Sequence, residues 1–382
     1  MINCAILACR LVFPAQRVRC HDGFVPARAP GTYHANPMTA TIPGAGADPR
    51  FALLSTWVAG VLGTREFAIA PASADASFRR YFRITPAVAW RGSATLIAMD
   101  APPPMEDCRP YLHVARLLAD AGVHAPAVLA QDLAQGFLLL TDLGARTYLA
   151  ALDAASAPGL YSDAIDALIR WQLATRDGEL PPYDEGLLAR ELDLFPEWYV
   201  GRHLAHTLSS AQAATLADAR RKVLANNLAQ PRVYVHRDYH SRNLMVSTPN
   251  PGVLDFQDAV VGPITYDLVS LLRDAYVTWD EERELDLAVR YWERASRAGL
   301  PVGRDFGAFW LDYEWMGAQR QLKVLGIFAR LAHRDGKTAY LGDMPRVMAY
   351  LRRAATRYRA LGNLARLLDE LEERKPVVGY TF

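Results

Sequence analysis

"VYVHRDYHSRNLMVSTPNPGVLDFQDA", residues 233–259, places His, Arg, Asp and Asn side chains between short runs of Val and Leu. The apolar runs have the length and the β-branched content of buried strands, and Asn250, Pro251 and Gly252 are typical turn residues between two of them. Polar groups between buried strands cost free energy unless they find partners. Such a concentration of them therefore indicates that this stretch presents its side chains to a ligand.

The order of the polar residues in this stretch points to phosphoryl transfer. His236-Arg237-Asp238 is followed by Asn243 and then by a strand that carries Asp255, which is the order found in protein-kinase-like phosphotransferases. The reaction needs a carboxylate beside the acceptor hydroxyl, for which Asp238 is the candidate. It also needs hard oxygen ligands for Mg²⁺, which Asn243 and Asp255 would supply from adjacent strands. The sequence therefore predicts an ATP- and Mg²⁺-dependent phosphotransferase.

Three further polar residues accompany this motif. His236 opens the loop, and Asp267 stands at a helix start after Gly262 and Pro263, so we expect both to organise the loop more than to react. Asp258 is open between two roles: an auxiliary contact to metal or substrate, and a hydrogen-bonding residue of the loop.

Composition excludes several classes of protein. The chain has 382 residues, 51% of them hydrophobic, which is enough for two lobes. Lys plus Arg (42) nearly balances Asp plus Glu (41), so no overall field would attract nucleic acid or an anionic membrane. No uninterrupted apolar run approaches the roughly 18 residues of a membrane span, and the four cysteines fit neither a zinc motif nor a disulfide framework. We expect a cytoplasmic monomer that binds neither nucleic acid nor membrane.

The periodicity divides the chain into a sheet-rich and a helical part. After an amphipathic helix from Phe51, strand-like segments at 78–86, 94–102 and 128–144 surround one helix at 110–122. Beyond Gly144 the pattern is helical, interrupted mainly by the segment quoted above. The predicted helices are 161–175, 185–204, 210–229, 266–276, 282–299, 306–334 and 344–373.

These segments predict an α+β fold with two lobes. A small β-rich N-lobe, 51–141, would hold the nucleotide, and a larger helical C-lobe, 142–382, would hold the catalytic loop, the metal and the acceptor. Residues 1–50 show no periodic pattern. We expect them to be a disordered extension or upstream sequence from a mis-assigned start, with Met38 as an alternative start.

Two segments carry a resemblance to a known family. "VHRDYHSRNLMV" and "GVLDFQDAVVGPITYDLVSL" resemble the aminoglycoside phosphotransferase family, whose members share the kinase-like two-lobe fold and phosphorylate small molecules. The resemblance extends over nearly everything from residue 51 onward. It implies that Asp238 is the catalytic base and that Asn243 and Asp255 bind magnesium. It also implies that "LLLTDLG" is the hinge whose backbone holds adenine, through Leu140, Thr141, Asp142 and Leu143.

A narrower resemblance concerns the acceptor. "SADASFRRYFRI" (73–84), "MDAPPPMEDCRPY" (99–111), "LFPEWY" (194–199) and "MGAQRQLKVLGIFARLAHRDGK" (316–337) are similar to bacterial N-acetylmuramate/N-acetylglucosamine kinases. Those enzymes phosphorylate the anomeric hydroxyl of sugars recovered from peptidoglycan, so the resemblance implies a small amino-sugar substrate.

N-acetylmuramate carries a lactyl carboxylate, which requires a cation in the large lobe. Arg320 and Lys323 lie three residues apart and so share one face of a core-facing helix, where cations are costly unless a carboxylate meets them. We therefore expect both to bind the substrate. The alternative is a structural salt bridge to a glutamate such as Glu191 or Glu314.

Two departures from the kinase pattern leave other functions open. "SADASFRRYF" stands where a Gly-rich phosphate loop belongs, so Ser77 and an arginine, Arg79, Arg80 or Arg83, would have to bind the phosphates. The alternative is an ordinary strand turn with solvated arginines. Met99 replaces the phosphate-pairing lysine, as it would in a nucleotide-binding pseudokinase. A kinase of another small alcohol, such as an aminoglycoside, choline or homoserine, is the other alternative.

Overall fold

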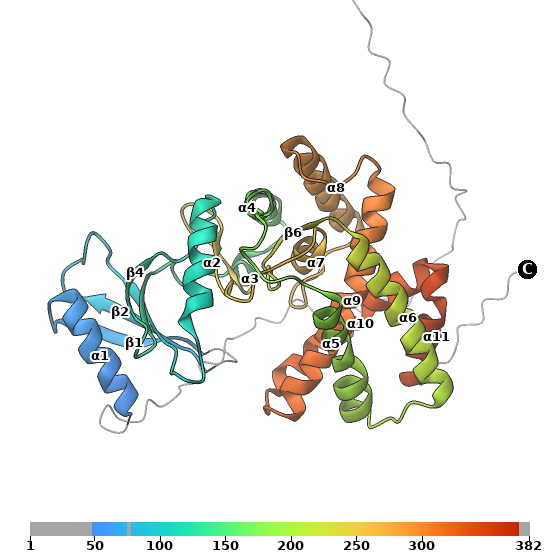
Figure 1. Cartoon of the computed structure of the whole chain (residues 1–382), viewed down its shortest axis with the longest axis horizontal. Helices are drawn as coiled ribbons and strands as arrows, with labels where there is room; N and C mark the ends of the chain where they lie inside the picture. The colour runs from blue at the N-terminus through green and yellow to red at the C-terminus, as the bar shows by residue number, and fades with distance from the viewer. Residues whose placement is uncertain (1–47, 75–77, 374–382) are drawn as a thin grey trace, which may run out of the picture. The chain divides into compact units, whose positions relative to one another are not determined.

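The computed structural model describes residues 48–74 and 78–373 of the chain (Figure 1). The prediction for residues 1–50 lies almost entirely outside this range. Helix α1 (Pro49–Leu62) begins at Pro49, so the helical part starts slightly before the expected residue 51. Ser77 also lies outside the described residues.

Five antiparallel strands form the sheet of the N-lobe, in the order β1-β2-β3-β5-β4. They are β1 (Phe67–Ala74), β2 (Arg80–Pro86), β3 (Leu96–Asp100), β4 (Val128–Asp132) and β5 (Phe137–Thr141). On β5, Phe137 and Leu139 pack with α1, whereas Leu138 belongs to the apolar cluster of α2 (Cys108–Asp120). Since a strand alternates its side chains between two faces, α1 and α2 cover opposite faces of this sheet.

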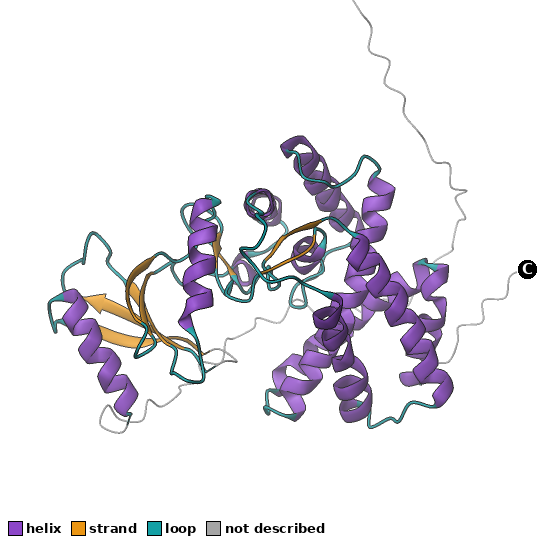
Figure 2. Ribbon diagram, viewed as in Figure 1, coloured by secondary structure: helices purple, strands orange, loops and turns teal. Residues whose placement is uncertain are grey.

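Helices dominate the rest of the described chain (Figure 2). In chain order they are α3 (Tyr148–Ala151), α4 (Ala157–Leu173), α5 (Glu185–Leu194), α6 (Ser210–Ala229), α7 (Tyr266–Leu272), α8 (Glu281–Ala298), α9 (Phe306–His333), α10 (Met344–Arg357) and α11 (Gly362–Leu371). None of the described helices is long and apolar enough to cross a membrane. The predicted α+β class, with a small β-rich lobe and a larger helical lobe, is confirmed.

The quoted segment folds as short paired strands, but they are shorter than its apolar runs predicted, so Asn243 and Asp255 lie just outside the strands and not on them. β7 (Leu244–Met245) pairs with β8 (Gly252–Val253), with the predicted turn between them. β6 (Arg232–Val235) instead pairs with β9 (Val260–Pro263), which the sequence analysis had not identified as a strand.

Two predicted helices are interrupted. The stretch 185–204 begins as α5 and continues from Phe195 to His203 as a π-helix, where Pro196 lacks the N–H that a regular helix would use. The stretch 344–373 divides into α10 and α11, because the backbone at Tyr358 is extended.

Helix α9 packs against α5, α6, α7 and α10. At Gly326 an added Cβ would lie 2.4 Å from the backbone carbon of Leu194, so glycine permits the close approach of α9 to the end of α5. The side chains of α7 are all buried. α9 therefore supports both α5 and α7, the two helices whose residues reach the candidate site.

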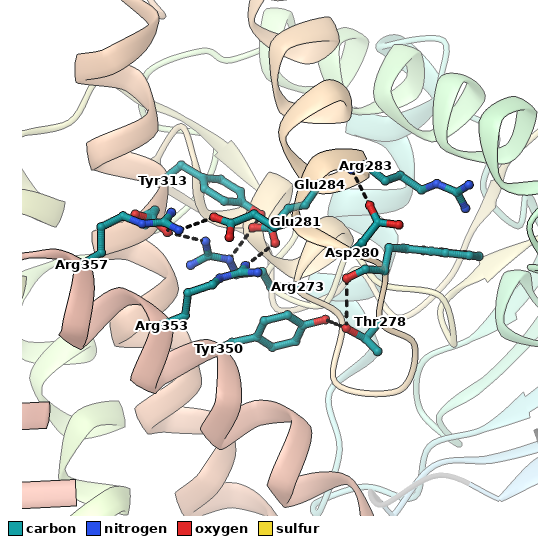
Figure 3. Close-up of polar contacts among 12 residues, drawn as sticks. Arg273, Thr278, Asp280, Glu281, Arg283, Glu284, Tyr313, Tyr350, Arg353 and Arg357 are labelled. Atoms are coloured by element: carbon teal, nitrogen blue, oxygen red, sulfur yellow. Dashed lines mark hydrogen bonds and ion pairs between the residues drawn. The ribbon is translucent and has the colours of Figure 1, made fainter. Parts of the chain in front are cut away.

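A buried ionic network joins the end of α7 to three other helices (Figure 3). Arg273 is fully buried; its Nε donates to Glu284 of α8 at 2.6 Å and its Nη2 donates to Glu314 of α9 at 2.8 Å. From α10, Arg353 pairs with Glu284 and Arg357 with Glu314. Glu314 thus forms its ion pairs with Arg273 and Arg357. The suggested pairing of Glu314 with Arg320 or Lys323 is therefore not found in this structure.

We predict that Arg273→Met lowers the free energy of unfolding by about 3–5 kcal/mol, because it removes the central cation from two buried carboxylates. Urea unfolding followed by circular dichroism measures the change. The control is Arg290→Met, which removes an exposed arginine paired with Asp286 on the surface of α8 and should leave the unfolding midpoint unchanged. Equal effects of the two substitutions would contradict the assigned role of the network.

Candidate active site

The loop that follows β6 is held by one carboxylate. The backbone N–H groups of His236 and Arg237 donate to the two oxygens of Asp267, at 2.6 and 3.0 Å. Arg237 has a φ of 77°, a left-handed conformation that directs successive N–H groups toward one anion. Burial raises the pKa of Asp267 to about 7 in spite of these hydrogen bonds. Asp267 therefore makes the contact that an organising role requires.

Asp238 follows in this loop and is half-buried. Burial acts to raise its pKa, but the charges of Lys323, His240 and Arg237 outweigh that effect and hold the pKa below its ordinary value. Asp238 is therefore an ionised carboxylate at neutral pH, able to orient a hydroxyl group and accept its proton.

Asn243 and Asp255 lie next to this carboxylate. Nδ2 of Asn243 donates to the backbone oxygen of Asp238 at 3.0 Å and lies 3.4 Å from Oδ2 of Asp255. Asp255 has a φ of 61° and receives a hydrogen bond from Gln257 at 2.8 Å. A left-handed backbone at a residue other than glycine is uncommon and clusters at functional sites. The structure thus brings together the three residues in which the sequence placed the chemistry.

The oxygens of Asn243 and Asp255 are hard donors of the kind that Mg²⁺ prefers. Within residues 48–74 and 78–373, no group of three His, Cys, Asp or Glu side chains could hold a metal ion by itself. The pair fits a magnesium ion that takes its remaining ligands from water and phosphate oxygens, which is the usual arrangement in nucleotide sites.

Asp258 lies beyond this group. Its side chain is exposed, with Oδ2 3.5 Å from Gln257, and its backbone oxygen accepts a hydrogen bond from Arg237 at 3.4 Å. These contacts match the role of a hydrogen-bonding residue in the loop.

The predicted hinge connects β5 to the C-lobe. Thr141 donates its N–H to Ala127 at 3.0 Å, and Leu140 is buried. Asp142 accepts hydrogen bonds from Arg83, at 2.6 and 3.1 Å, and these bonds help to keep its pKa low against the opposing effect of burial. Leu143 packs over Gly252, where an added Cβ would lie 2.7 Å from Cδ1 of Leu143. The β7–β8 hairpin therefore packs against the hinge through Gly252.

The three arginines considered for phosphate binding have different partners. Arg83 stabilises the hinge, and Arg80 pairs with the buried Asp100. Nε of Arg79 lies 3.7 Å from Glu106, a residue just before α2. The ring of Tyr111 on α2 lies 4.7 Å from that of Phe256, the neighbour of Asp255, and the charges of Arg79 and Asp255 both act on the hydroxyl of Tyr111. Of the three arginines, Arg79 is thus the one whose charge acts on a residue that Asp255 also influences.

Arg320 and Lys323, expected together, differ in their surroundings. Nζ of Lys323 lies 2.8 Å from Glu191 and donates to the hydroxyl of Tyr266 at 2.9 Å, so the salt-bridge alternative describes Lys323. Arg320 is 3% exposed, and its Nη1 has no hydrogen-bond partner among the described residues.

Glu191 is a site residue that sequence reasoning considered only as a salt-bridge partner. It also pairs with Arg237 at 2.7 Å, and so connects the loop of Asp238 to Lys323. Arg242, His240 and Tyr276 were not identified from the sequence either. The guanidinium carbon of Arg242 lies 3.6 Å from the ring centroid of Tyr276, and the ring of His240 lies 5.5 Å from that of Tyr276. Arg242 and His240 stand within the motif itself, and that position was the available indication, whereas no pattern marks Tyr276.

Comparison with known proteins places this arrangement in context. Residues 68–306 match the phosphotransferase enzyme family. An N-acetylmuramate/N-acetylglucosamine kinase of Pseudomonas putida is 53% identical over 302 residues, which cover 79% of this chain and 87% of that protein. One of Pseudomonas aeruginosa is 50% identical over 337 residues, 85% of this chain and 98% of that protein.

Solved structures show the same fold at low sequence identity. The aminoglycoside phosphotransferase APH(2")-IIa in complex with gentamicin superimposes with a TM-score of 0.54 at 13% identity, covering 81% of this chain and 97% of that one. A choline/ethanolamine kinase family protein from Mesorhizobium loti gives 0.53 at 18% identity, covering 85% and 96%. These likenesses support the protein-kinase-like two-lobe fold.

We predict that Asp267→Asn loosens the loop, because an amide offers one acceptor oxygen in place of the two that receive His236 and Arg237. Hydrogen exchange measured by mass spectrometry should show faster exchange in the peptide that contains both residues, and the free energy of unfolding should fall by about 1–3 kcal/mol. The matched control is Asp258→Asn, whose carboxylate is exposed. Unchanged exchange in Asp267→Asn would show that the carboxylate does not hold the loop.

Proposed function

Because the chain belongs to the phosphotransferase enzyme family, we propose that it transfers the γ-phosphoryl group of ATP to the anomeric hydroxyl of N-acetylmuramate and N-acetylglucosamine. The contacts of Asn243 with Asp238 and with Asp255, which bring the three residues together, are the observation that carries the proposal. The high identity to kinases named for these two sugars supports the choice of acceptor. The reaction would serve peptidoglycan recycling in the cytoplasm, with the protein acting as a monomer.

Asp238 acts on the acceptor. Its carboxylate orients the anomeric hydroxyl, whose oxygen forms a bond to the γ-phosphorus while the bond from phosphorus to the bridging oxygen of ADP breaks. The hydroxyl proton passes to Asp238 late in the reaction. An anomeric hydroxyl is more acidic than an ordinary alcohol, so a carboxylate with a low pKa suffices as the acceptor.

Asn243 and Asp255 hold the phosphate end of the nucleotide. Magnesium, when bound by these residues, supplies the positive charge that neutralises the phosphate oxygens. The hydrogen bond from Asn243 to the backbone of Asp238 ties the position of the metal ligand to that of the base. The hinge around Asp142 and Leu143 is the proposed adenine contact.

The Arg79–Glu106 pair takes the place of the lysine–glutamate pair of protein kinases. In protein kinases a lysine of β3 pairs with a glutamate of the following helix and with the phosphates. Here β3 contributes Met99, which is fully buried in the apolar cluster of α2. Arg79 supplies a cation from the residue before β2, and Glu106 supplies the carboxylate from the turn before α2. This pair favours an active kinase over a nucleotide-binding pseudokinase.

Release of ADP tests the proposed acceptor. With ATP and Mg²⁺, we expect turnover with N-acetylmuramate and N-acetylglucosamine and little with glucose, choline or kanamycin. Asp238→Asn should lower kcat by about a hundredfold or more, because the base is lost. Asp286→Asn on the exposed face of α8 is the matched control. Turnover confined to choline or kanamycin, or full activity of Asp238→Asn, would overturn the proposal.

Arg79→Gln tests the replacement of the lysine. Loss of a charge-assisted contact to phosphate should raise the KM for ATP and lower kcat, together by about tenfold to a hundredfold in kcat/KM. Steady-state kinetics with varied ATP measures this effect. Arg109→Gln, in an exposed pair with Asp107 on α2, is the control. Equal kinetics for the two variants would show that another group binds the phosphates.

A further inference from the structure

Tyr276, which follows α7, is surrounded by cations near the candidate base. The guanidinium carbon of Arg242 lies 3.6 Å from the centroid of its ring, and the charge of Arg320 acts on its hydroxyl. The ring of His240 lies 5.5 Å away in an edge-on contact. His240 and Arg242 belong to the loop of Asp238, whereas Arg320 comes from α9. Arg242 therefore contacts Tyr276 directly, and the charge of Arg320, from a distant part of the chain, also acts on that residue.

Arg320 is buried without a carboxylate. Its side chain makes no ion pair or hydrogen bond among the described residues, and its Nη1 is inaccessible to solvent. Two other buried cations of this region differ, since Arg273 meets Glu284 and Glu314, and Lys323 meets Glu191. A buried cation that lacks a partner destabilises the fold. Arg273 and Lys323 are thus each paired with a carboxylate, whereas Arg320 is not.

The two buried acids of this region, Asp274 and Asp267, are already engaged by backbone donors. Asp274 is 1% exposed, and its oxygens accept the N–H groups of Ser241 and Tyr276, each at 2.8 Å. Asp267 likewise holds the backbone of the loop. These acids lower the local positive potential, but their oxygens accept backbone N–H groups and none of them pairs with Arg320, so the guanidinium keeps its capacity to bind a carboxylate.

Arg242 is exposed, and its described contacts are with the rings of Tyr276 and Tyr340, the latter at 5.5 Å. A guanidinium that stacks on an aromatic ring keeps its N–H edge available for a carboxylate. Arg242 directly precedes Asn243, so this edge lies in the loop that carries the proposed chemistry.

His240 is close to the proposed base, Asp238, and interacts with one of these cations. The charges of Asp238 and Arg320 both act on its ring, and its Nδ1 has no hydrogen-bond partner among the described residues. The backbone N–H of His240 also donates to the backbone oxygen of Asp238 at 3.0 Å, so His240 lies beside the residue that orients the acceptor hydroxyl in the proposed function. An acceptor bound at Asp238 would have this group of cations beside it.

We propose that Arg320 and Arg242, with His240 and Tyr276, form a receptor for a carboxylate on the acceptor sugar. The inference rests on the proposed function and specifies it. N-acetylmuramate bears a lactyl carboxylate that N-acetylglucosamine lacks, so the receptor selects the acidic sugar. Guanidinium groups suit this task because they bind carboxylates through paired N–H groups.

Three acceptors distinguish the effect of the carboxylate charge from the effect of the size of the lactyl group. They are N-acetylmuramate, its neutral methyl ester, and N-acetylglucosamine. Arg320→Met should lower kcat/KM for N-acetylmuramate by about a hundredfold and that for the two neutral acceptors far less. Arg242→Gln should change the same ratio in the same direction, and Arg320→Lys should restore part of it. Arg334→Gln, an exposed arginine just after α9 that pairs with Asp335, is the control.

Thermal unfolding gives a second measurement. Since Arg320 is a buried cation without a partner, Arg320→Met should raise Tm while selectivity is lost. A lower Tm together with equal losses for all three acceptors would show that Arg320 is structural, and unchanged ratios would show that the carboxylate binds elsewhere.

Binding of N-acetylmuramate by calorimetry distinguishes failure of this inference from failure of the proposed function. If the wild-type protein phosphorylates neither sugar but binds N-acetylmuramate through Arg320, the receptor stands and the kinase reaction does not. Turnover of both sugars with binding that is independent of Arg320 would overturn the receptor alone.

Discussion

The carboxylate of Asp267 accepts both backbone N–H groups that open the loop of Asp238, and the geometry of the site depends on this contact. Asp267 belongs to α7, a helix of seven residues whose side chains are all buried. The residue after Arg273 extends the same arrangement, since Asp274 accepts the N–H of Ser241 further along the loop. Hydrogen bonds therefore fix the loop at two points, one to α7 and one to the residues that directly follow this helix.

A short helix can position a loop only if it is itself immobilised. Arg273 fixes the end of α7 to α8, α9 and α10 through Glu284 and Glu314, and α9 packs along it. A second set of ion pairs fixes the loop itself, since Glu191 of α5 pairs with both Arg237 of the loop and Lys323 of α9. Buried ion pairs contribute little net stability, but removal of one partner is costly, so they select one arrangement of helices.

The general fold and the centre of the site were predictable because their determinants are close together in the chain. Asp238 and Asn243 precede a short hairpin, β7–β8, whose strands and turn are visible in the sequence, and Asp255 follows it. Asn243 contacts both of the other residues in the structure. The change from strand to helix periodicity likewise separates the two lobes. Local patterns fail at Pro196 and Tyr358, where the backbone departs from the regular helix that the periodicity predicts.

The roles of individual cations were not predictable, because their partners are far away in the sequence. Arg83 meets Asp142 at the hinge, Arg80 meets Asp100, and Arg79 meets Glu106, although the three arginines are near neighbours in the chain. Arg320 and Lys323 share a helix, yet Glu191 is near only one of them. Charge and periodicity show that a cation is present, whereas tertiary packing decides which carboxylate reaches it.

The position of the transferred phosphate tests the central claim most directly. The reducing ends that remain should be counted against the ADP formed, with phosphorus NMR of the product sugar. A phosphate on the anomeric oxygen removes one reducing end for every ADP, and this equality is the result that the account predicts. Formation of ADP with all reducing ends retained would place the phosphate on another hydroxyl, and would contradict the claim that Asp238 presents the anomeric oxygen to ATP.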